Sequence, residues 1–203
     1  MGALVAWDLA GSAPVPEPEA EPEPDVAPHF AEALAAIRAA AARVRDPIDH
    51  HDGILSDSLL EVGAATDDLV ARAEALVRRG DAIGRHVSGT DPQRIEREIQ
   101  QREASAASMR DPAAAASLRV AADAKRRELS TWAELRDQHA RIVAELVAVE
   151  SSLDALRARV VALTLNDPGD AAAGESIGAE LHELGERLDV LERAAAATIR
   201  SIA

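Results

Sequence analysis

From Phe30 onward, apolar residues recur at alternating spacings of four and three along most of the chain. This spacing places them on one face of a helix and is typical of coiled coils and helical bundles. Four such seams follow one another, over residues 30–48, 55–87, 95–163 and 177–202. We therefore predict an all-α protein in which each helix buries one stripe of side chains.

The four seams do not share one register. The register slips by one residue around positions 50–53, and the third seam shifts by three between Trp132 and Leu135. Such shifts change the face that a helix presents to its neighbour. Each of them therefore predicts a point where the helix bends or restarts.

Two short turns, SGTDP at 88–92 and NDPGD at 166–170, indicate antiparallel neighbours. Folding the chain back about the first turn brings Asp46 to the level of the shift after Trp132. We expect an elongated antiparallel coiled coil or helical bundle with a three-helix head (29–45, 135–165 and 171–202). Its two-helix stalk consists of 47–88 against 92–133, with Ile48 or His51 packed near Trp132.

Asp-Pro dipeptides mark the expected helix starts, because Asp is a strong N-cap and Pro suits the first helical position. They occur at Asp46-Pro47, Asp91-Pro92, Asp111-Pro112 and Asp167-Pro168. An alternative topology makes Asp111-Pro112 a true chain reversal. It gives an up-down bundle of four or five helices without a stalk, and the sequence leaves both topologies open.

Residues 1–28 differ from the helical domain at 29–203. Pro alternates with Glu over much of this region, which favours an extended chain with little to bury, so we predict a disordered acidic tether. The apolar run within residues 1–11 is too short to span a membrane. It is either a docking peptide or the stub of a longer segment that tethers the protein to a membrane.

Composition narrows the function. Ala contributes 46 residues, and the only aromatic residues are Trp7, Phe30 and Trp132. The net charge of -14 argues against a nucleic-acid partner. The absence of cysteine excludes disulfides and thiolate zinc sites and fits a cytoplasmic location. Lys125 is the sole lysine, a bias towards arginine that is typical of GC-rich bacterial genomes.

The stretch DPIDHHDG at 46–53 combines three carboxylates with two histidines. Asp46 and Asp49 have a structural explanation, as the N-cap and third residue of a predicted helix. Two histidines on one helix bind a metal best at a spacing of three or four residues, whereas His50 and His51 are adjacent. The candidates for a metal site are His50, His51 and Asp52.

The doublet His51-Asp52 resembles the HD doublet of helical, metal-dependent phosphohydrolases. The resemblance implies a divalent metal ion and the hydrolysis of a phosphate ester. It covers these two residues, and the long heptad seams depart from that family's globular core. A phosphohydrolase that uses His50, His51 and Asp52 is therefore the alternative to a nonenzymatic function.

His139 occupies a seam position between Leu135 and Ile142. One interpretation is a half-buried, hydrogen-bonded residue that sets the register. The other is a pH-sensitive junction, because protonation would bury a charge.

We expect a nonenzymatic coiled-coil scaffold or protein-interaction module that forms a homodimer or binds a partner helix. No cofactor, small-molecule substrate, nucleic acid or membrane span is predicted. The predicted interaction seam comprises Leu135, His139, Ile142, Leu146, Leu181, Leu184, Leu188 and Leu191.

Overall fold

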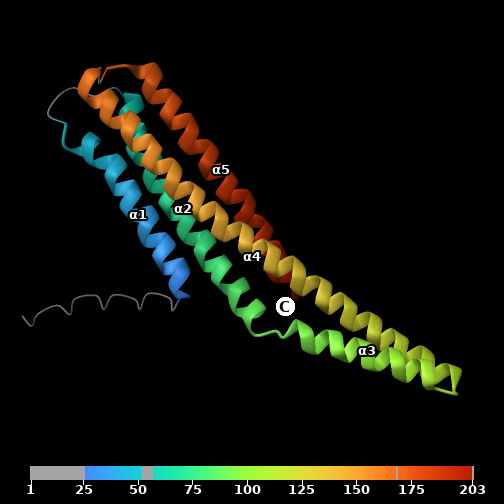
Figure 1. Ribbon diagram of the computed structural model, residues 1–203. Helices are drawn as coiled ribbons and strands as arrows, with labels where there is room; N and C mark the ends of the chain where they lie inside the picture. The colour runs from blue at the N-terminus through green and yellow to red at the C-terminus, as the bar shows by residue number, and fades with distance from the viewer. Residues whose placement is uncertain (1–25, 52–56, 168, 203) are drawn as a thin grey trace, which may run out of the picture.

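The computed structural model describes residues 26–51, 57–167 and 169–202, which form five helices (Figure 1). These are α1 (Pro28–Asp49), α2 (Asp57–Ser88), α3 (Pro92–Ser108), α4 (Pro112–Asn166) and α5 (Ala171–Ile202). The described ranges contain no strand, so the predicted all-α fold is confirmed. Predictions for the tether up to residue 25, and for Asp52, Leu55 and Pro168, lie outside the described residues.

Four helices, namely α1, α2, α5 and the second half of α4, pack into one bundle (Figure 1). Two ion pairs show that α1 is antiparallel to α2. Arg38 is bonded to Glu74 at 2.7 Å, and Arg45, further along α1, is bonded to Asp67, which lies earlier in α2, at 2.7 Å. The predicted seams meet in one core, which includes Phe30, Ile37, Val44, Leu59, Leu69, Leu76, Ile142, Leu146, Leu153, Leu156, Ile177 and Leu188. Heptad spacing therefore identified the buried faces correctly.

A long helical hairpin extends out of this bundle. One arm consists of α2 followed by α3, and the other is α4, whose 55 residues span roughly 80 Å at 1.5 Å per residue. The arms keep nearly one register, since the Trp132 indole donates to the Val87 carbonyl at 3.2 Å and Lys125 pairs with Glu98 at 3.7 Å. Beyond the bundle, α3 is the one described helix that accompanies α4, and these two form a protruding two-helix stalk (Figure 1).

An elongated bundle with a stalk was predicted, but the assignment of helices to the bundle and to the stalk was wrong. The whole of α2 belongs to the bundle, where it packs on α1, α4 and α5, so the head has four helices. The turn at 88–92 does not reverse the chain, because α2 and α3 do not pack on each other and point the same general way (Figure 1). The chain instead reverses between α1 and α2.

The predicted neighbour of Trp132 was wrong for the same reason. Trp132 lies beside Val87. Ile48 is placed elsewhere along the bundle, because Arg43, which precedes it in α1, pairs with Asp154. The second reversal is at Asp111-Pro112, as the alternative topology proposed, although that topology had no stalk.

The Asp-Pro dipeptides differ in role. Asp91 and Asp111 are N-caps as predicted, each accepting a 3.0 Å hydrogen bond from the amide two residues later. Asp46 does not start a helix, because Pro47 lies in the last turn of α1, where a missing amide removes only one helical bond. Asp167 is the C-cap of α4, and α5 is capped by Asp170, which accepts from the Ala173 amide at 3.1 Å.

One glycine of α2 makes room for the largest buried ring. A Cβ at position 80 would lie 2.6 Å from Cζ of Phe30 and 3.0 Å from Cγ2 of Ile142. Phe30 is only 1% exposed, so its ring has little space to retreat. Gly63, in the same helix, has no atom within 4 Å of an added Cβ.

Gly80→Ala is expected to destabilise the protein by about 1–3 kcal/mol through overpacking, an effect larger than the gain in helix propensity. Gly63→Ala is the matched control and is expected to stabilise by about 0.5–1 kcal/mol through propensity alone. Urea denaturation followed by circular dichroism measures both. Equal effects of the two substitutions would contradict the packing of Phe30 on Gly80.

Candidate functional site

The histidines of the DPIDHHDG stretch lie at the end of α1. His50 is its C-cap, with Nδ1 at 3.0 Å from the Asp46 carbonyl oxygen and 3.2 Å from Asp46 Oδ1. Both side chains are more than 70% exposed, at 79% for His50 and 74% for Asp46. Asp49 is the last residue of α1 rather than the third residue of a helix, so its predicted role was wrong.

The residues that the structure describes contain no group of three or more His, Asp or Glu side chains arranged to hold a metal ion. Asp52 lies outside them, so the metal-site candidates His50, His51 and Asp52 stay a prediction. Within the described part of this stretch, the exposed His50 closes the helix end, and the half-buried His51 follows it with its amide bonded to the Ile48 carbonyl at 3.4 Å.

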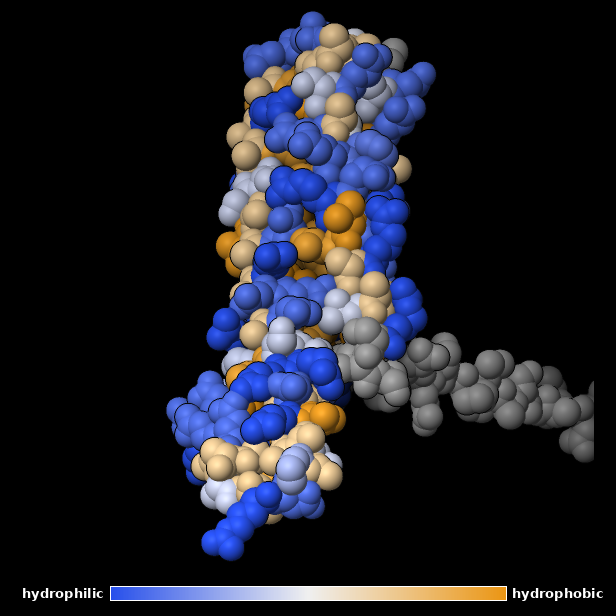
Figure 2. All heavy atoms as spheres, turned by 90° about the vertical axis from the view of Figure 1, so that its right-hand side faces the viewer, coloured by the Kyte–Doolittle hydropathy of each residue, from blue (hydrophilic) through white to orange (hydrophobic). Residues whose placement is uncertain are grey.

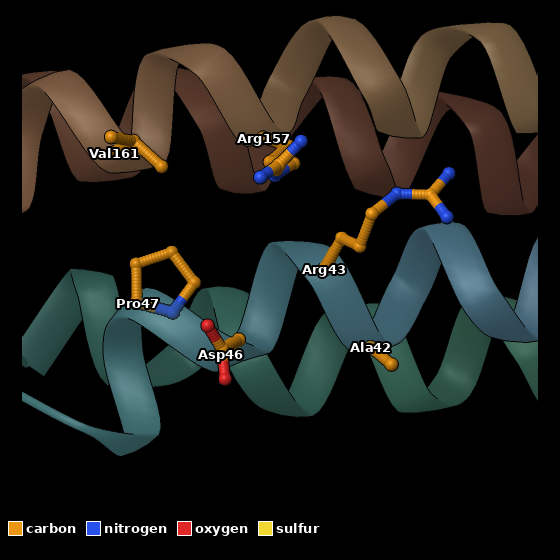
Figure 3. Close-up of a pocket in the computed structure, with 6 residues that line it drawn as sticks. All are labelled: Ala42, Arg43, Asp46, Pro47, Arg157 and Val161. Carbon is orange, nitrogen blue, oxygen red and sulfur yellow. The ribbon is translucent and has the colours of Figure 1, made fainter.

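A shallow groove of about 320 Å³ lies beside this helix end, between α1 and α4 (Figure 3). Its walls carry Ala42, Arg43, Asp46, Pro47, Arg157 and Val161. Arg43 is bonded to Asp154 at 2.7 Å, and both of those side chains are substantially exposed. The groove combines two arginines and one carboxylate with apolar side chains, and its lining includes no nucleophile paired with a general base.

The predicted interaction seam is used within the chain. Six of its residues are at most 3% exposed, and His139 and Leu191 are half-buried. The residues at or below 3% are Leu135, Ile142, Leu146, Leu181, Leu184 and Leu188. These six side chains therefore pack within the bundle of the chain itself.

The stalk buries far fewer side chains than the bundle does. Only Ile95, Ile99, Ala106, Ala115 and Ala122 are buried along it, within residues 91–132. Val120 and Met109 are 65% and 44% exposed, and pale, weakly hydrophobic residues lie among hydrophilic ones over the stalk in the lower part of Figure 2. Between the arms, Glu98 pairs with Lys125 at 3.7 Å and accepts from Arg102, whose hydrogen bond lowers the pKa of Glu98.

Bundle and stalk meet at a cluster of polar and aromatic side chains. Asp81 of α2 is only 2% exposed, and its Oδ1 accepts a hydrogen bond from the Ala27 amide at 2.9 Å. Its Oδ2 forms an ion pair with Arg85 but receives no hydrogen bond of good geometry. The carboxylate thus holds the start of α1 against α2.

Sequence reasoning missed Asp81. The available signal was its place beside Gly80, a seam position, which puts a carboxylate at the edge of the buried stripe. His139 is half-buried as expected, but its Nε2 has no hydrogen-bond partner among the described residues. The hydrogen bond expected of this ring is therefore not made by Nε2.

Asp81→Ala is expected to destabilise the protein by about 1–3 kcal/mol, because the Ala27 amide loses its acceptor at a partly buried site. Asp81→Asn retains an acceptor and should cost less. Asp67→Ala, which removes an exposed ion pair between the same two helices, is the control and should cost under about 1 kcal/mol. Urea denaturation ranks the three, and a loss at Asp81→Ala no larger than the control's would contradict the anchoring role.

In the part of the chain described by the structure, no helix combines the length and apolarity needed to cross a membrane. Comparisons with protein-family models, with curated proteins and with solved structures find no match to the chain.

Proposed function

We propose that the protein is a nonenzymatic helical scaffold that binds other proteins and self-associates through its stalk. The main support is the small hydrophobic core of the stalk, where three of the five buried side chains are alanines. Alanine burial contributes little hydrophobic free energy, and a lone helix pair is seldom stable on that basis. A second copy would add the missing cover.

Charge favours the stalk over the bundle as the surface for self-association. Residues 91–132 carry eight basic and seven acidic side chains, whereas the rest of the chain has a net charge of -15. Two copies that approach through their bundles bring like charges together, and two stalks do not. Exposed Val120 of α4 and Met109 at the end of α3 supply apolar surface on the stalk.

The grooves between the bundle helices are consistent with a binding role. The groove in Figure 3 is open to solvent and borders exposed ion pairs. A reaction that must exclude water needs an enclosed site with convergent polar groups. The proposal includes a cytoplasmic location, with which the cysteine-free composition is compatible.

Light scattering coupled to size exclusion is expected to show an elongated dimer at concentrations up to about 100 µM. Removing residues 97–103 together with 120–126 shortens both arms by one heptad while preserving the register, and should shift the protein towards monomer. Val120→Glu should act in the same direction without shortening the stalk. Val190→Glu places the same charge on a side chain of α5 that is 56% exposed, and is the control.

A wild-type protein that is monomeric throughout this range would overturn stalk self-association. A dimer that is weakened equally by Val120→Glu and Val190→Glu would also contradict it. Unchanged unfolding of the bundle in the shortened variant shows that loss of the dimer is not loss of the fold.

Titration with Mn²⁺ tests the nonenzymatic part of the proposal. No stoichiometric binding is expected, because the described residues, His50 and His51 included, contain no group of three or more His, Asp or Glu side chains that could hold a metal ion. Tight binding that disappears in His51→Ala would instead favour the metal-dependent hydrolase. Isothermal calorimetry measures both variants.

A further inference from the structure

The junction between bundle and stalk contains three rings packed against a glycine. His139 of α4 meets Phe30 edge to face, with 5.4 Å between ring centroids and an interplanar angle of 81°. The His29 ring lies 5.6 Å from the same histidine, and a Cβ at Gly84 of α2 would come within 2.9 Å of His139 Nε2. The imidazole thus contacts both α1 and α2 from its place on α4.

The space around His139 suits a neutral ring. Its Nε2 is shielded from solvent and has no hydrogen-bond partner among the residues that the structure describes, so a proton on this nitrogen would find no acceptor among them. Burial lowers the pKa of His139, and the nearby His29 lowers it further. The Asp81 carboxylate opposes both effects and is the weakest of the three.

The charged groups around the ring explain why Asp81 does not dominate. From α1 the titratable neighbour is His29, and from α2 it is Asp81. Asp81 is already engaged by the Ala27 amide and the Arg85 guanidinium. A proton on His139 therefore gains little from this carboxylate, while the neighbouring His29 disfavours it.

We propose that His139 is an acid-sensitive latch, which holds the first turns of α1 on α2 and α4 while its ring is neutral and releases them when it is protonated. The released part is the start of α1, because Phe30 and His29 are the ring neighbours of His139 and both belong to it. Release uncovers the slot at Gly80, which Phe30 fills, and its apolar wall at Ile142. The latch thus couples proton uptake to exposure of an apolar surface, independently of stalk self-association.

The direction of the pH dependence follows from the lowered pKa. Above the ordinary histidine pKa of about 6.5 the ring is neutral in both folded and unfolded chains, so the stabilisation is complete. As the pH falls below that value, the unfolded chain takes up the proton more readily than the folded one. Stability of the contact is therefore lost on acidification, until the folded-state pKa of His139 is passed.

Hydrogen exchange measured by mass spectrometry at pH 7.5 and 5.5, corrected for intrinsic rates, tests the latch on the full chain. Protection of residues 28–37 is expected to fall by about threefold or more at the lower pH, while protection of α5 changes less. His139→Gln keeps a polar side chain without a titrating ring and should make protection of this segment insensitive to pH. His182→Gln alters an exposed histidine of α5 and is the control.

Nuclear magnetic resonance titration of the histidine rings provides a second readout, and its main measurement is made on the wild-type protein. His139 is expected to titrate below the ordinary value, and His29→Gln should raise its pKa by removing the neighbouring charge. An ordinary pKa for wild-type His139 would overturn the proposal. So would wild-type protection of residues 28–37 that is the same at both pH values.

Discussion

The structure depends on one uninterrupted helix. The 55 residues of α4 form a single rod that belongs to both the bundle and the stalk, and each of the other four helices packs against some part of it. Its second half presents a continuous stripe of large aliphatic side chains, which needs the three neighbours α1, α2 and α5. Its first half presents mainly alanine, which one close neighbour can cover. The change from four helices to two follows from this change of side chain.

Local patterns in the sequence were sufficient for the elements and their buried faces. The spacing of Leu59, Val62, Leu69 and Leu76 predicted the buried stripe of α2, and all four are at most 1% exposed. Such spacing depends only on the geometry of one helix, so it can be determined without knowing the neighbours. The same is true of the caps at Asp91 and Asp111, where a side chain bonds to an amide two residues away.

The pairing of helices could not be determined in this way. A heptad seam accepts several neighbours, and the turn at 88–92 has the same composition whether the chain reverses or continues. The irregularities at 88–92 and after Trp132 do lie at one level, as the indole bond to Val87 shows, but the sequence suggested Asp46 as the counterpart. Likewise, Asp46-Pro47 has the composition of a helix start, whereas Pro47 lies inside the last turn of α1. Asp81 was missed because its partner is a backbone amide 54 positions away, which leaves no trace in the sequence.

The two arms of the hairpin differ where they leave the bundle. The arm of α2 and α3 is interrupted at 89–91, whereas α4 crosses the same level without a break. At the junction, therefore, one of the two antiparallel arms is a continuous helix and the other is broken. Bending that opens or closes the break at 89–91 meets little resistance, whereas bending that stretches α4 works against the backbone hydrogen bonds of that helix. The stalk is therefore expected to bend in one preferred plane, about a hinge beside Trp132.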